Sequence, residues 1–209
     1  PAPRWRAGGG VALGQGPDMV GASEGGGPGF ARCLAPGEVP ISRLEGDPTS
    51  TVFRFDASGE FRPLPYIAFV LGVKGQATGD ALLSFEEYSV GNYTVGRGYD
   101  PGTLLGDNGL GFQAELRFGS IIPRSIDDLA AQPYVFVDAG WVWNEDRLNI
   151  RDVRQDLVSV GGGVRALWGD RGQLDVVLGG PLERAGLVTE RPHVRLLVSL
   201  TTRLWPWSY

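Results

Sequence analysis

Hydrophobic and polar residues alternate along most of this chain. The alternation predicts eight β-strands, most of them about 10 to 13 residues long, over 4–14, 50–62, 65–77, 109–119, 133–143, 156–167, 172–181 and 193–204. In the last of these, Leu196 and Val198 share one side of the strand. Arg195 and Ser199 share the other side. Strands of soluble proteins average about 5 to 6 residues, whereas a tilted membrane-spanning strand needs about 9 to 11. The predicted lengths therefore favour a sheet that spans a membrane.

The segments between the predicted strands alternate in length. Residues 63–64 and 169–172 form tight turns, whereas the segments 15–49, 78–108, 144–155 and 182–192 are long. Short turns at one end and long loops at the other are typical of transmembrane β-barrels. The segment 120–132 is the exception, and residues 125–129 within it are predicted to form one helical turn.

Tryptophan and glycine positions agree with a barrel wall. The tryptophans fall near or just beyond the predicted strand ends, at Trp5, Trp141, Trp143, Trp168, Trp205 and Trp207. Indole rings prefer the interface between lipid and water. Glycine runs at 8–10 and 161–163 lie inside strands, where we expect them to relieve curvature, although inward-facing glycines also make room for a segment in the lumen.

Composition narrows the function classes. The chain has 209 residues, with 24 acidic and 19 basic side chains and a net charge of −5, which argues against a nucleic-acid surface. The chain has one cysteine, Cys33, so it has no internal disulfide. It also has one histidine, His193. These low counts argue against a zinc site and against a Ser-His-Asp triad. We expect neither enzymatic activity nor a metal or cofactor. No run of about 18 apolar residues predicts a transmembrane helix, which leaves the β-barrel.

Two short motifs occur on successive segments. The Gly-rich loop before the strand 109–119 contains Arg97, Gly98 and Tyr99, and the next strand contains Phe136, Asp138 and Gly140 in a Phe-x-Asp-x-Gly pattern. This combination resembles the outer-membrane transporters of two-partner secretion, the haemolysin activation/secretion protein family. In that family a Val/Ile-Arg-Gly-Phe/Tyr loop folds back into the barrel, and its arginine pairs with the aspartate of the wall motif. Here Gly96 stands where the family usually has Val or Ile.

The resemblance implies an all-β fold, a transmembrane antiparallel β-barrel. Five predicted strands follow the loop, as in the family's 16-stranded barrel. We therefore expect residues 1–209 to be the C-terminal part of such a barrel, about half of it, without the periplasmic POTRA domains and the plug helix. The loop 78–108 is expected to fold into the lumen. A closed eight-stranded barrel is filled by its own side chains and leaves little room for that loop.

Alternation also places the wall aspartate. Asp138 shares a side with Phe136, and because a charge facing lipid is costly, we expect this side to face inward. There the planar fork of Arg97 matches the carboxylate. Glu115, inward on the adjacent strand, is a second acceptor. Gly98 would let the loop approach the wall closely, and Tyr99 would pack on it. For Glu115, as for the other inward charges Arg117, Arg165 and Arg195, the favoured expectation is that the side chain lines a hydrated lumen.

These features predict a protein-translocating pore of the bacterial outer membrane in a Gram-negative organism. It would secrete, and activate, a partner exoprotein, and it would contact outer-membrane lipid but no nucleotide or nucleic acid. Arg97 and Asp138 would act as gate and latch, not as catalysts. Two alternatives stay open. One is a barrel-assembly or insertase protein of the same superfamily, and the other is a soluble ligand-binding β-barrel, which requires an apolar interior.

Overall fold

Eight long strands form one antiparallel sheet in the computed structural model, which describes residues 4–15, 43, 46, 50–91, 95–123, 125, 127–145, 154–185 and 193–202. The strands are β1 (Arg4–Gln15), β2 (Thr51–Leu64), β3 (Ile67–Thr78), β6 (Asn108–Phe118), β7 (Leu129–Trp143), β8 (Gln155–Trp168), β9 (Gly172–Pro181) and β10 (Arg195–Thr202). They lie in the sheet in this order, so each long strand pairs with the next one along the chain. The predictions about Cys33, Trp205, Trp207 and the side chain of Trp5 lie outside the described residues.

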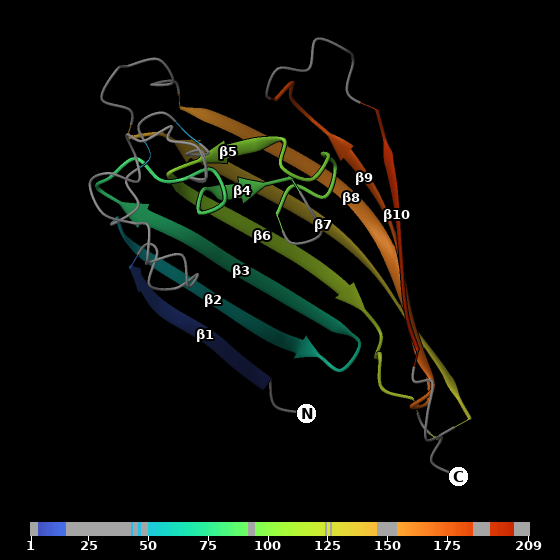
Figure 1. Cartoon of the computed structure of the whole chain (residues 1–209). Coiled ribbons are helices and arrows are strands. Elements are labelled where there is room, and N and C mark those ends of the chain that lie inside the picture. The colour runs from blue at the N-terminus through green and yellow to red at the C-terminus, as the bar shows by residue number, and fades with distance from the viewer. Residues whose placement is uncertain are drawn as a thin grey trace.

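The sheet is strongly curved (Figure 1). Strands β1 and β10 lie at its opposite edges and do not pair with each other in the described part of the chain. Two further strands, β4 (Tyr88–Val90) and β5 (Leu104–Gly106), form a separate small sheet inside the curve. This hairpin contacts β6 and β7. The fold is therefore a curved antiparallel wall with one long connection resting on its concave side.

All eight predicted long strands are confirmed, with ends that differ by a few residues. The first tight turn falls at residues 65–66 and not at 63–64, because Leu64 still pairs with Ile67 across an irregularity that contains Pro63. The helical turn predicted at 125–129 does not extend to Leu129, and residue 126 lies outside the described residues. One turn bond, from the Asp128 N–H to the Ser125 carbonyl at 3.2 Å, precedes a strand that already begins at Leu129. The hairpin β4–β5 was not predicted.

The two faces of the sheet differ as the alternation predicts. Along β7 the side chains of Phe136 and Asp138 are 3% and 0% exposed, whereas Val135 and Val137 are 49% and 45% exposed. The exposed apolar residues of the long strands include Phe53, Phe69, Leu71, Leu110, Phe112, Val164, Leu178, Leu196, Val198 and Leu200. Apolar side chains thus cover the convex side and ionic ones the concave side. A soluble ligand-binding barrel would have the opposite arrangement.

The glycine run in β8 makes room for aromatic rings. Cross-strand pairing places Gly161 opposite Phe136 and Gly163 opposite Tyr134. A Cβ atom would lie 2.6 Å from the Phe136 ring at Gly161 and 2.7 Å from the Tyr134 ring at Gly163. These two glycines therefore serve the packing of the concave face, in addition to the curvature that the sequence analysis expects. No helix of the described residues has the length and apolar character needed to span a membrane.

A charge placed on the convex face tests which side meets lipid. Val137→Arg, near the middle of β7, is expected to lower the stability of the membrane-inserted protein by about 2–4 kcal/mol, because an arginine at mid-bilayer depth faces lipid. The measurement is the fraction of protein that refolds into lipid vesicles at increasing urea, read from heat-modifiable mobility on a gel. Ser199→Arg, on the concave side of β10, is the control. Equal losses in both variants would contradict the assignment.

Candidate functional site

The connection between β3 and β6 packs against glycines of β6 and β7. A Cβ atom at Gly109 would lie 2.0 Å from the Tyr88 ring, and one at Gly140 would lie 2.5 Å from a methyl group of Val90. Gly111 is in the same position beneath Val95, at 2.8 Å. The side chains of this connection therefore sit directly on the β6–β7 backbone. This contact gives the glycine of the Phe-x-Asp-x-Gly pattern a physical reason: a side chain at residue 140 would displace the hairpin.

At the tip of this connection, Arg97 binds Asp138 with three hydrogen bonds. The Arg97 Nε atom lies 2.9 Å from Asp138 Oδ2, and Nη2 lies 2.7 Å from Oδ1. The Arg97 backbone N–H also donates to Oδ2 at 3.0 Å. Both residues are buried, with exposed fractions of 2% and 0%. Within the described residues, all the hydrogen bonds of the Asp138 carboxylate come from Arg97.

Glu115 is the second acceptor for the same guanidinium. Arg97 Nη1 donates to Glu115 Oε1, and the guanidinium carbon lies 3.6 Å from the centre of the Phe136 ring. Arg165 also binds Glu115, at 3.0 and 3.1 Å, and Arg117 Nε donates to it at 2.7 Å. Three arginines therefore surround one carboxylate. Removing Arg97 leaves Glu115 with two cations, whereas Asp138 keeps none among the described residues.

The ionic cluster extends along the wall beyond the predicted residues. Arg165 Nε lies 3.0 Å from Asp175 Oδ2, and its guanidinium lies over the Tyr134 ring at 4.1 Å. The Tyr134 hydroxyl donates to Asp175 Oδ1 at 2.8 Å. Arg165 and Arg117 are thus members of an ion-pair cluster on the concave wall, and their side chains are 17% and 22% exposed. The hydrated lumen beside them stays a prediction. Arg195 contacts Asp100 at 3.2 Å, and that aspartate is largely exposed.

Gly98 and Tyr99 attach the loop tip to β8 and β9. A Cβ atom at Gly98 would lie 2.8 Å from backbone atoms of Gly180 and Pro181. On the wall side, a Cβ atom at Gly179 would lie 2.9 Å from the Arg97 carbonyl oxygen. The two backbones are therefore in direct contact. The buried Tyr99 hydroxyl lies 2.9 and 2.8 Å from the carbonyl oxygens of Val158 and Glu183. Burial raises the pKa of Tyr99, so its hydroxyl stays neutral at physiological pH.

The charge of Arg97 is maintained by its partners. Burial acts to lower the pKa of Arg97, but the hydrogen bonds and charges of Asp138 and Glu115 outweigh it and raise the pKa above its ordinary value. Deleting one partner of a buried ion pair typically costs about 3–5 kcal/mol, because the other charge stays buried. The Arg97–Asp138 contact is therefore a strong attachment of the loop to the wall.

A second buried carboxylate joins several long connections. Asp107, which is 0% exposed, binds Arg43 of the connection between β1 and β2. Its carboxylate also accepts the backbone N–H groups of Leu82 and Glu145, each at 2.8 Å. Arg43 additionally contacts Glu87 at 3.3 Å. No sequence motif marks this contact, so it was not predicted from the sequence.

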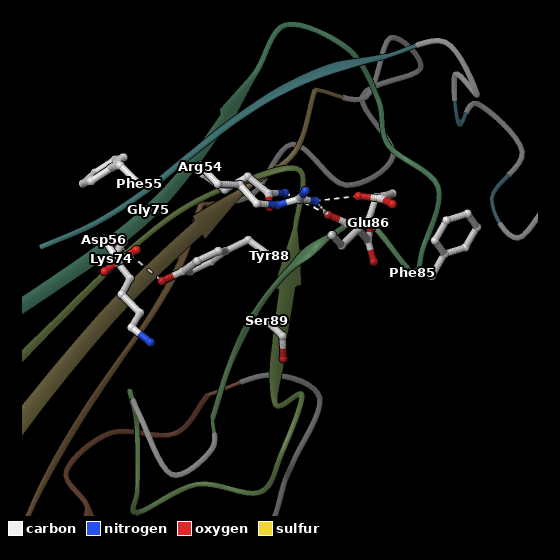
Figure 2. A pocket seen from close by; sticks show the side chains of 11 residues that line it. Arg54, Phe55, Asp56, Lys74, Gly75, Phe85, Glu86, Tyr88 and Ser89 are labelled. Atoms are coloured by element: carbon white, nitrogen blue, oxygen red, sulfur yellow. Dashed lines mark hydrogen bonds and ion pairs between the residues drawn. The ribbon is translucent and has the colours of Figure 1, made fainter. Parts of the chain in front are cut away.

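On its other side the loop faces a cleft (Figure 2). The cleft has a volume of about 430 Å³ and lies between β2 and β3 on one side and residues 85–89 on the other. Arg54 crosses it to Glu86, and the Tyr88 hydroxyl lies 3.3 Å from the Lys74 carbonyl oxygen. Arg54 and Glu86 are partly exposed, and such ion pairs contribute only about 0–1 kcal/mol. Among the described residues, no group of His, Cys, Asp and Glu has the arrangement of a metal site.

Comparisons with known proteins show a family and a solved structure that this chain resembles. The model of the family "Haemolysin secretion/activation protein ShlB/FhaC/HecB" matches residues 11–166. Among solved structures, the chain is similar to CdiB from Escherichia coli, with a TM-score of 0.63 and 17% sequence identity. That match covers 74% of this chain and 28% of the CdiB chain, so it supports the fold. A search of curated proteins gives no match.

Proposed function

Because this chain belongs to the haemolysin secretion/activation family ShlB/FhaC/HecB, whose members are outer-membrane transporters of two-partner secretion, we propose that it forms the wall and gate of a pore that exports a partner exoprotein. Its location is the outer membrane of a Gram-negative bacterium. The partner is a secreted exoprotein, as the family implies. In this proposal the pore secretes this partner, and activation of the partner is a second role.

The curved sheet is one part of a larger barrel in this proposal. Residues 1–209 form its C-terminal part, and the loop 78–108 occupies the lumen. The support is the exposed apolar convex face, the ionic concave face, and the open edges at β1 and β10 in the described chain. The chain spans 28% of the length of the CdiB chain that it resembles. A lumen that holds both the loop and a passing polypeptide must be wider than that of an eight-stranded barrel.

The buried contact between Arg97 and Asp138 carries the proposal. It connects a loop that lies inside the curve to the wall of the sheet, at the two motifs that the family resemblance singles out. Gly98 and Tyr99 position the loop tip, while Phe136, Gly140 and Glu115 complete the surface that receives it. The arrangement is a latch that holds the loop in the lumen and so sets the secretion-competent state. Its side chains bind one another and carry out no bond-making step.

The direct test is to delete the gene in its own organism and compare the proteins secreted into the medium. We expect one large exoprotein to disappear from the medium and to return when the gene is restored. Mass spectrometry of the medium identifies that exoprotein. An unchanged set of secreted proteins would overturn the proposal. A general loss of other outer-membrane barrels, with no specific loss from the medium, would instead indicate the assembly function.

A further inference from the structure

The loop divides the concave side of the sheet unequally. Toward β8 and β9 its backbone touches the wall, since Gly98 and Gly179 leave no space for even a Cβ atom. Toward β2 and β3 it leaves the cleft of about 430 Å³ shown in Figure 2. A volume of this size lies within the range of binding pockets, about 300–1,000 Å³. While the latch is closed, the space beside the loop is therefore on the β2–β3 side.

The cleft is lined by polar groups of both signs. Asp56 and Lys74 lie opposite each other on β2 and β3 and are both exposed. In the described part of the chain, neither side chain has an ion-pair partner. On the loop side, Ser89 is exposed, and burial raises the pKa of Tyr88 to about 12, so Tyr88 adds no negative charge. The lining also includes the exposed aromatic ring of Phe85. Separated charges beside one exposed ring offer a passing chain several weak contacts, as conduction requires.

The contacts that bridge the cleft are weaker than those of the latch. Arg54 and Glu86 are partly exposed, whereas Arg97 and Asp138 are buried. A Gln76 side-chain N–H also donates to the Glu86 carbonyl at 2.9 Å. These contacts involve residue 86, which lies outside β4, whereas Tyr88 and Ser89 pair with β5 and Tyr88 packs on β6. A small displacement of residues 85–87 away from β2 and β3 would therefore break the contacts across the cleft without changing the bonds between Arg97 and Asp138.

We propose that this cleft is a binding site for an extended segment of the exported polypeptide as it passes the latched loop. The inference rests on the proposed function and adds the route: the polypeptide lies between residues 85–89 and the β2–β3 wall. It is in contact with Lys74 and Asp56. The β8–β10 side of the loop, where Ser199 lies on β10, is not on this route.

The test traps the exported protein in transit. The exoprotein identified by the gene deletion is fused at its C-terminus to a stably folded domain, so that it stalls in the pore, and carries single cysteines along its sequence. The complete transporter carries Lys74→Cys, with other cysteines replaced, including Cys33→Ser. Ser199→Cys is the matched control on the concave face. Ser89→Cys probes the loop side of the cleft if Lys74→Cys does not insert.

A disulfide needs Cα atoms within about 7 Å, so we expect at least about five times more adduct at residue 74 or 89 than at residue 199. Equal or greater adduct at residue 199 would overturn the route. Export without adduct at residues 74 and 89 would overturn it as well. These two results leave the transport function in place if the same transporter variants still export the exoprotein without the fused domain, which is measured in parallel. A gene deletion that leaves the secreted proteins unchanged would overturn both the function and the route.

Discussion

Replacing Arg97 with alanine is expected to reduce export of the exoprotein at least about tenfold, while the barrel still folds and inserts. The substitution leaves the Asp138 carboxylate fully buried without its side-chain partner, and the loss of such a partner typically costs about 3–5 kcal/mol. Each 1.4 kcal/mol of free energy changes an equilibrium constant about tenfold. The substitution therefore removes most of the preference for the latched over the unlatched loop. The measurement is exoprotein in the medium, relative to the amount of heat-modifiable transporter in the membrane.

Two variants separate the latch from a general effect of losing an arginine. Arg97→Lys keeps the charge but loses the planar fork and the stacking on Phe136, so export should fall to an intermediate level. Arg171→Ala removes an arginine from an ion pair with the exposed Asp127, and export should not change. Normal export by Arg97→Ala, at an unchanged amount of transporter, would exclude the latch.

Replacing Gly98 with valine should also reduce export strongly, although the ionic groups of the latch remain. A Cβ atom at this position lies 2.8 Å from the backbone of Gly180 and Pro181 and from the Ser159 side chain. Backbone atoms of a paired strand move little, so the loop tip must move away from the wall. Overpacking of this kind typically costs about 1–3 kcal/mol. Export is measured in the same way as for Arg97→Ala.

The loss of export should increase with the size of the side chain added at residue 98. Gly98→Ala should have a smaller effect than Gly98→Val, because the first adds a single methyl group. Gly79→Ala is the matched control, since a Cβ atom at Gly79 meets nothing within 4 Å. If Gly98→Val exports as well as Gly79→Ala does, then the close approach of the two backbones is not needed for export.

Much of the wall was predictable because strand geometry has a period of two. Once one polar residue of β7 is assigned inward, Phe136 and Asp138 follow, and pairing brings Glu115 beside them. The pair of Arg165 and Asp175 was also within reach of the sequence. The tight turn at 169–171 pairs Trp168 with Gly172, and counting three residues away from the turn on each strand gives Arg165 opposite Asp175.

Other parts of the site depend on tertiary contacts that no local pattern records. Strands β4 and β5 have three residues each, which is too short for a periodicity to be recognised. Their position is set by the glycines of β6 and β7 beneath them. Arg43 and Asp107 are 64 residues apart, and neither belongs to a motif. Such long-range pairs become visible only when the connections are placed over the sheet.

The unequal sharing of cations between Glu115 and Asp138 has a consequence for how the loop returns to its latched position. When the loop moves away, Arg165 and Arg117 still neutralise Glu115, but Asp138 loses its sole described cation. A bare carboxylate then marks one position of the wall and attracts the nearest guanidinium. An arginine-rich stretch of cargo would compete with Arg97 for that position, so the sequence of the cargo would influence how soon the loop is latched again.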